Sequence, residues 1–109
     1  MKKLYRIKKN EEFTRIIQEK HSMASANFVL YTSDKKEEVA RVGISVSKKL
    51  GDAVDRNRIK RQVREMAKLL IDFEGGNKDV IIIVRSPFTK NTYQENLLDL
   101  EKMLKKAII

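Results

Sequence analysis

Alternation of apolar and polar residues predicts two β-strands in the first half of the chain, at residues 27–32 and 41–47. The first strand has apolar side chains on both faces, whereas the second has them on one face only. The apolar positions are Phe28 with Leu30 and Val29 with Tyr31 in the first strand, and Val42, Ile44 and Val46 in the second. We therefore expect the second strand to have only one face in the core.

The other face of the second strand is small and polar. It consists of Arg41, Gly43, Ser45 and Ser47. Such a face admits a ligand close to the backbone, and an ordinary solvated sheet face explains the pattern equally well. A third strand is predicted at residues 79–84, which are apolar after Asp79, as in a central strand covered on both faces.

Helical periodicity predicts three helices. The first is capped by Asn10, ends near Lys20 and has Phe13, Ile16 and Ile17 as its apolar positions. The last begins with a capping box of Thr92 and Glu95, and its apolar stripe is Leu97, Leu100, Leu104 and Ile108. The order helix, strand, strand, helix, strand, helix indicates a single α+β domain over residues 1–109, with helices packed on a mainly antiparallel sheet.

The middle helix is amphipathic in an unusual way. It is capped by Asp52 or, alternatively, by Asp55, and it ends before Gly75 and Gly76. At 100° per residue, a core stripe forms from Ile59, Val63, Met66 and Leu70, with Ala67 beside it. The opposite side collects Asn57, Lys60, Arg61, Arg64 and Lys68, with Arg56 and Arg58 on the flanks.

Net charge changes the interpretation of this helix. The chain of 109 residues carries a formal charge of +9, and it has no cysteine to form disulfides or thiolate metal sites. Residues 1–9 contribute +5 without any acid, and residues 48–68 contribute another +5, while the remaining segments are balanced. A surplus gathered in two segments indicates a surface for an anionic partner.

Nucleic acid is the partner that the helix suits best. Like charges four residues apart, such as Lys60 with Arg64, destabilise a helix by a few tenths of a kcal/mol unless an anion lies against them. A phosphate backbone relieves that repulsion, and arginine adds bidentate contacts. Asn57 can both donate and accept a hydrogen bond, so it could contact a base edge or a sugar hydroxyl. A merely solvated basic face is the alternative.

The segment "SVSKKLGDAVDRNRIKRQVRE" resembles the signature of the bacterial ribonuclease P protein component. The matching residues are Lys48, Lys49, Gly51, Ala53, Val54, Arg56, Asn57, Arg58, Lys60, Arg61 and Arg64. Further similarity lies in "RIKKNEEF", "FVLYT", "RVGISVSKK" and "DVIIIVR", so the resemblance covers nearly the whole chain. The chain departs from the family pattern at Ile17, often aromatic in relatives, near Lys20, usually glycine, and at Ser25-Ala26, usually Asn-Arg.

The resemblance implies a non-catalytic subunit of a ribonucleoprotein that removes the 5′ leader of precursor tRNA. The RNA subunit, with bound Mg²⁺, would carry the chemistry, and the protein would bind no cofactor of its own. The resemblance implies a left-handed βαβ crossover. The RNA-facing residues would be Lys49, Arg56, Asn57, Arg58, Lys60, Arg61, Arg64 and Lys68. The cleft for the 5′ leader would use Phe13, Ile17, Tyr31, Ser45, Ser47, Lys48 and Arg85.

Other functions find little support in the residues. The one histidine, His21, is interpreted as a surface residue, and the acidic pairs Glu11-Glu12 and Glu37-Glu38 as solvated charge. A helix-turn-helix would need another helix shortly before the basic one, where a strand is predicted. A ribosomal protein or another plain nucleic-acid-binding module is the main rival. No apolar run approaches the roughly 20 residues of a membrane span, so we expect a soluble, cytoplasmic protein without a membrane or obligate protein partner.

Overall fold

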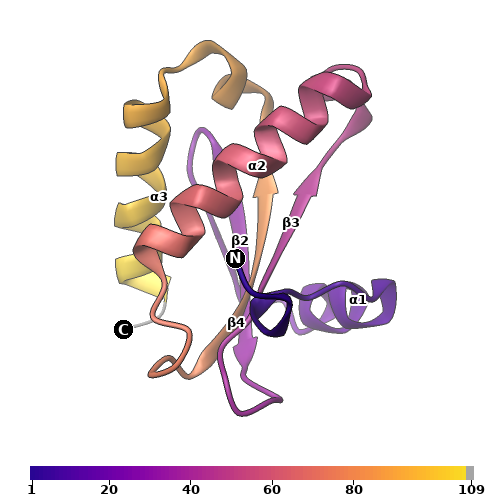
Figure 1. Ribbon diagram of the computed structural model, residues 1–109, viewed down its shortest axis with the longest axis vertical. Coiled ribbons are helices and arrows are strands. Elements are labelled where there is room, and N and C mark those ends of the chain that lie inside the picture. The colour runs from indigo at the N-terminus through magenta and orange to yellow at the C-terminus, as the bar shows by residue number, and fades with distance from the viewer. Residues whose placement is uncertain (108–109) are drawn as a thin grey trace.

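Three helices and four strands make up the computed structural model, which describes residues 1–107 (Figure 1). The helices are α1 (Asn10–Gln18), α2 (Ala53–Leu70) and α3 (Tyr93–Ala107). The strands are β1 (Ser22–Ala24), β2 (Phe28–Asp34), β3 (Val42–Val46) and β4 (Lys78–Val84). Short 3-10 turns lie at Lys3–Tyr5, Lys48–Leu50 and Ser86–Lys90.

The sheet is mixed, in the order β1-β2-β4-β3. β2 pairs antiparallel with β1 on one side and with β4 on the other. β3 and β4 are parallel, and α2 connects them along the chain. In Figure 1, β3 and β4 point upward, α2 lies in front of them, and β4 lies to the left of β3. This path is a left-handed crossover, the rare hand for a βαβ unit. The α+β prediction is confirmed.

The sheet separates two layers of helices. α2 and α3 cover one face, where the main core includes Phe28, Leu30, Val63, Ile82 and Leu100. α1 covers part of the other face, above a smaller cluster of Ile7, Ile16 and Ile81. The strand alternation explains the division, because Val80, Ile82 and Val84 face α2 and α3 while Ile81 and Ile83 face α1.

Capping residues set where two of the helices begin. The Asp52 carboxylate accepts a hydrogen bond from the Asp55 backbone N–H, and the Asp55 carboxylate accepts one from the Asp52 backbone N–H, so Asp52 is the N-cap of α2. The predicted box of Thr92 and Glu95 is present at the start of α3. The prediction for Asn10 is wrong: α1 begins there, but its N-cap position is Lys9, and no side chain caps it.

The end of α1 shows what the departure from the family pattern at Lys20 costs. Lys20 has a φ of 62°, in the left-handed region where glycine is favoured and other residues are strained. A glycine near this position in relatives would meet that requirement without the strain. The short strand β1 follows at once, and the sequence pattern did not predict it.

The apolar stripes of α2 and α3 are largely as predicted. Ile59, Val63, Met66 and Ala67 are buried, and Leu70 is half-buried. In α3, Leu100 and Leu104 are buried and Leu97 is half-buried, whereas Ile108 lies outside the described residues. Over residues 1–107, none of the helices has the length and apolar content that crossing a membrane requires.

Candidate RNA interface

The cations of α2 project from a helix whose opposite side is buried in the core. The buried side of the helix packs on the sheet and on α3, and the helix lies at the front of the molecule in Figure 1, with its outer side facing away from the sheet. Asn57, Arg58, Arg61 and Lys68 are exposed on that outer side, and Lys49 is exposed in the turn before the helix. A buried ridge of this kind holds the exposed cations in a fixed pattern.

Most of these cations have no carboxylate partner. Arg58 forms an ion pair with Asp55 at 3.4 Å, and both side chains are about half exposed. Within residues 1–107, Lys49, Arg56, Lys60, Arg61, Arg64 and Lys68 form no ion pair. Glu65, the acid between Arg64 and Lys68, instead accepts a hydrogen bond from the Tyr93 hydroxyl of α3 at 3.2 Å. Positive charge on α2 is therefore largely uncompensated.

The cations divide between two flanks of the helix. Arg56, Lys60 and Arg64, spaced four residues apart, are half-buried along one flank. Lys60 and Arg64 line a cavity of about 590 Å³ beside the free edge of β3. That cavity is also lined by Arg6 and Lys8 from the N-terminal segment, and by no acidic residue.

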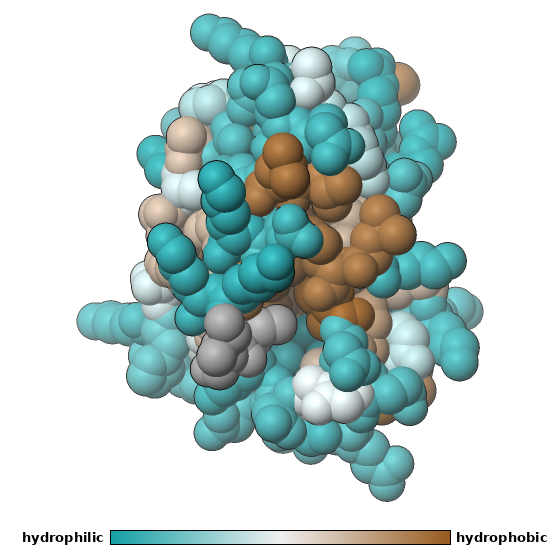
Figure 2. Space-filling view, turned by 90° about the vertical axis from the view of Figure 1, so that its left-hand side faces the viewer, coloured by the Kyte–Doolittle hydropathy of each residue, from teal (hydrophilic) through white to brown (hydrophobic). Residues whose placement is uncertain are grey.

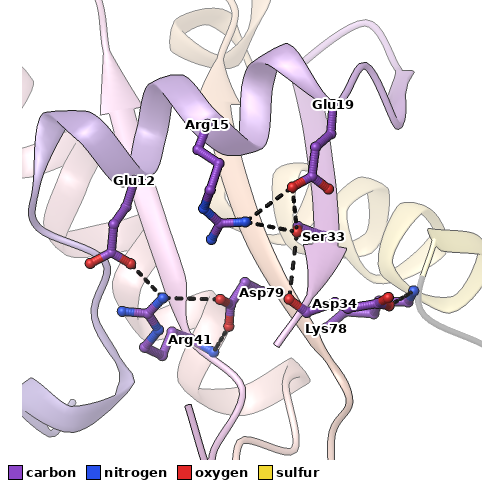
Figure 3. Close-up of polar contacts among 8 residues, drawn as sticks. All are labelled: Glu12, Arg15, Glu19, Ser33, Asp34, Arg41, Lys78 and Asp79. Atoms are coloured by element: carbon purple, nitrogen blue, oxygen red, sulfur yellow. Dashed lines mark hydrogen bonds and ion pairs between the residues drawn. The ribbon is translucent and has the colours of Figure 1, made fainter. Parts of the chain in front are cut away.

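Polar contacts fasten α1 to the sheet on the opposite face (Figure 3). The Arg41 guanidinium forms an ion pair with Asp79 at 3.0 Å and another with Glu12 of α1 at 2.5 Å. The Arg15 guanidinium of α1 donates hydrogen bonds to Glu19, at the end of the same helix, and to Ser33 of β2. The Arg41 guanidinium holds the pKa of the Glu12 carboxyl below its usual range, although burial of that carboxyl works in the other direction. Glu12 is thus a structural ion-pair partner, and the interpretation of it as solvated charge is wrong.

Gly43 lets α1 come close to β3. A Cβ at this position would lie 2.6 Å from Cζ of Phe13 and 2.9 Å from Cδ1 of Ile81, so only glycine leaves room for the phenyl ring. The space above the backbone at Gly43 is filled by the chain's own Phe13. The opening for a ligand must therefore lie further along the strand, at Ser45.

The strand register shows where α1 stops covering the sheet. One row of paired residues, Tyr31, Ile81 and Gly43, lies next to the α1 residues Phe13 and Ile16. The next row is Val29, Ile83 and Ser45, and all three of its residues are half-buried. The sheet is therefore less covered at this second row, and of its three residues Ser45 lines the 590 Å³ cavity. The sequence predicted that β4 is covered on both faces. This prediction is wrong at Ile83, which is half-buried.

The predicted cleft residues are only partly brought together. Phe13 and Ser45 line the cavity that Lys60 and Arg64 also line, and Tyr31 packs beside Phe13 against the small α1 cluster. Ile17 is half-buried on α1 outside that cavity. Ser47 and Lys48 are exposed at the end of β3, where Ser47 accepts a hydrogen bond from the Lys49 backbone.

Arg85 points away from the other cleft residues. Its guanidinium donates to the Ser25 carbonyl at 2.6 Å, in the turn between β1 and β2 on the far side of β4 from β3. The Ser25 hydroxyl also accepts from the backbone of Asn27 and Phe28 and donates to Asp99. The departure at Ser25 therefore has a structural role in this turn.

Sequence reasoning did not identify several residues that the structure brings to the candidate site or beside it. Val29 and Ile83 were assigned only to strands, because an apolar strand residue gives no sign of being half exposed. Arg6 and Lys8 were counted in the basic N-terminal segment, yet nothing in the pattern placed them opposite α2. In the described residues, no three His, Asp or Glu side chains come together as a metal site.

Taken together, fold and site define a small α+β protein with an exposed cationic helix beside an open sheet edge. The family model for Ribonuclease P matches residues 1–108. A ribonuclease P protein component from a Geobacillus species is 48% identical over 108 residues, covering 98% of this chain and 93% of the relative. One from Bacillus cereus is 46% identical, covering 98% and 94%.

Solved structures agree with this match. A Staphylococcus aureus RNase P protein, described as a mutant with defective mRNA degradation activity, superposes with a TM-score of 0.85 at 46% identity, over 96% of this chain and 89% of that one. The RNase P protein from Thermotoga maritima gives a TM-score of 0.79 at 28% identity, over 93% and 96%. The chain belongs to the ribonuclease P protein family. Membership implies tRNA processing as part of a ribonucleoprotein nuclease.

Proposed function

We propose that this chain is the RNA-binding subunit of ribonuclease P and assists removal of the 5′ leader from precursor tRNA. The α2 cations, with Lys49, would contact the RNA subunit. The observation that carries this proposal is the row of cations on α2 that lack carboxylate partners and are held by a buried ridge. A phosphate backbone would supply the missing counter-charge and release bound counterions.

The 5′ leader would lie in the cleft between α1 and the sheet. An extended single strand needs an aromatic surface, room close to the backbone and flanking cations. Phe13 and Tyr31 provide the aromatic surface, Ser45 provides room, and Lys48 is an exposed cation at the end of β3. Arg85 would join this site only if its bond to the Ser25 carbonyl were exchanged for a phosphate.

The chemistry would belong to the RNA subunit. Among the described residues, the site contains cations, an amide and hydroxyl groups, and no pair of groups arranged as a nucleophile and its base. Mg²⁺ would be held through the RNA and the substrate phosphates, consistent with its preference for oxygen ligands and bound water. The protein would then act by binding and positioning.

Reconstitution tests this proposal directly. Precursor tRNA is incubated at low magnesium with a bacterial ribonuclease P RNA subunit, with the protein freed of RNA, and with both together. We expect the protein to speed 5′ maturation in the presence of the RNA subunit and to cleave neither precursor tRNA nor mRNA alone. Cleavage by the protein alone would overturn the non-catalytic role, and no acceleration of the RNA subunit would overturn the subunit assignment.

A further inference from the structure

The basic N-terminal segment is docked on the body of the protein by apolar and aromatic contacts. The ring of Tyr5 stacks on Phe73, in the loop between α2 and β4, with centroids 4.4 Å apart and planes 7° from parallel. The Tyr5 hydroxyl donates to Glu74 at 2.5 Å. Ile7 is buried, and its N–H donates to the Val42 carbonyl at the free edge of β3, 2.9 Å away.

This docking brings the cations of the segment opposite those of α2. Arg6 and Lys8 share the 590 Å³ cavity with Lys60 and Arg64. Lys2 shares a neighbouring cavity of about 480 Å³ with Lys68. Lys60, Arg64 and Lys68 are spaced four residues apart, so the segment runs along one flank of α2 over about two turns.

The arrangement places like charges together without carboxylates between them. Neither cavity has an acidic lining residue, and within residues 1–107 none of Lys2, Lys3, Arg6, Lys8 and Lys9 forms an ion pair. Mutual repulsion therefore opposes the docking, and the contacts of Tyr5 and Ile7 must outweigh it. A groove with cations on both walls is suited to a polyanionic chain running through it.

We propose that residues 1–9 and α2 form one two-sided groove for an RNA backbone, and that Tyr5, clamped by Phe73 and Glu74, is the residue that positions the N-terminal wall. The inference rests on the proposed function and extends it by adding Arg6 and Lys8 to the RNA contacts. Tyr5 itself contacts no RNA in this scheme. Its effect on binding passes through Arg6 and Lys8.

The test measures affinity for a bacterial ribonuclease P RNA subunit between about 0.05 and 0.2 M salt. Arg6→Ala/Lys8→Ala removes two phosphate contacts, so the slope of log K against log salt should fall by roughly 1.4–1.8. Tyr5→Ala should give a similar fall, while Tyr5→Phe, which keeps the stacking, should lose less. Combining Tyr5→Ala with Arg6→Ala/Lys8→Ala should lower the slope no further than either variant, because they remove the same contacts.

Leu4→Ala is the matched control, since Leu4 lies in the same turn and is 58% exposed, and it should leave the slope unchanged. A purely structural role for Tyr5 would lower the denaturant midpoint without moving the slope, and would overturn the proposal. An unchanged slope for Arg6→Ala/Lys8→Ala would overturn it even if Tyr5→Ala failed to fold. If the unmodified chain bound no RNA subunit, the proposed function itself would fail.

Discussion

At the scale of single residues, a buried charge cluster decides how α1 sits on the sheet. Asp79 is fully buried, Arg41 is 7% exposed, and Glu12 joins them from α1. The Arg41 backbone N–H also donates to Asp79 at 3.0 Å, so this carboxylate holds both the main chain and the guanidinium. Breaking such a buried pair leaves an uncompensated charge, which is why the cluster acts as a unit.

The Glu12 contact should make stability depend on pH. Its pKa is lowered by the Arg41 guanidinium, so in the folded state the carboxyl loses its proton at a lower pH than in the unfolded chain. The resulting stabilisation is present above the unfolded pKa of about 4.3 and is lost as pH falls through the folded value. Glu12→Gln should lower the free energy of unfolding by about 1–3 kcal/mol at neutral pH, and by less under acidic conditions.

Urea unfolding at about pH 7 and about pH 3.5 measures this difference, with Glu11→Gln as the control, since Glu11 is an exposed neighbour on the same helix turn. Glu11→Gln should change stability little at either pH. A difference between wild type and Glu12→Gln that grew on acidification would contradict the assigned direction of the pKa shift.

Residue-level prediction from sequence succeeded for local partners at the starts of α2 and α3, although it failed for Asn10 at the start of α1. The predicted capping box of Thr92 with Glu95 is present, and of the two predicted caps of α2 the structure has Asp52, in a box with Asp55 that was not predicted. The contact of Glu12 with Arg41 joins distant parts of the chain, so its own neighbourhood in the sequence indicated only a solvated acid.

At the scale of elements, α2 combines a core stripe with two different cationic flanks. Lys60 and Arg64 lie half-buried on the flank facing the N-terminal segment, and Arg61 lies exposed on the outer side. Within residues 1–107, Arg61 and Lys68 form no ion pair, and Arg58 pairs with Asp55 of its own helix across an exposed contact. Binding and stability should therefore respond separately to changes there.

Arg61→Ala tests this separation. Because Arg61 is exposed and points away from Ile59 and Val63, its loss should change the free energy of unfolding by no more than about 0.5 kcal/mol. If it contacts a phosphate of the RNA subunit, the salt slope should fall by roughly 0.7–0.9. Arg64→Ala should show the same fall in slope. Filter binding over a salt series, with chemical unfolding of the same variants, gives both quantities.

Lys102→Ala is the comparison variant, because Lys102 is an exposed cation on α3, away from the proposed groove. It removes the same charge and should leave the slope unchanged. If Lys102→Ala lowered the salt slope equally, RNA affinity would depend on the net charge of the protein alone. An unchanged slope for Arg61→Ala would remove that residue from the interface.

Elements with strong periodicity were predictable, and short or edge elements were not. The apolar stripe of α2 identified its buried side because four apolar residues follow one another at spacings of four, three and four residues, over about three turns. β1 has only three residues, Ser22–Ala24, and exists because β2 pairs with it, so its own pattern carries no signal. The half exposure of Ile83 depends on where α1 ends, which no strand pattern records.

At the scale of the whole molecule, apolar and cationic side chains gather on different parts of the surface. Figure 2 shows the side on which α3 lies, with a patch of apolar side chains among polar ones, and Leu98 of α3 is 47% exposed. The cations described above gather instead on α2 and the N-terminal segment. The sequence located both charged segments, but placing them together needed the parallel pairing of β3 with β4, which the alternation of apolar residues does not determine.

The net charge should make salt act in opposite directions on folding and on binding. The chain carries +9 on a body with a radius of gyration of 12.9 Å. At about 0.01 M salt the Debye length is near 30 Å, so all the cations repel one another, whereas at about 0.15 M it is near 8 Å and only close pairs do. Raising the salt from the lower to the higher value should raise the urea midpoint of the free protein.

RNA affinity should fall over the same range. Contacts with three phosphates alone predict a loss of at least about tenfold between 0.05 and 0.2 M salt. A variant with Lys3, Lys9 and Lys49 changed to Gln should show a smaller salt-induced rise in midpoint, because three of the repelling charges are gone. If the midpoint fell with salt, or rose as much in this variant, self-repulsion would not be what limits the stability of the free protein. The fold would then tolerate its two basic segments without an anionic partner, and the reason for expecting RNA to relieve that repulsion would be lost.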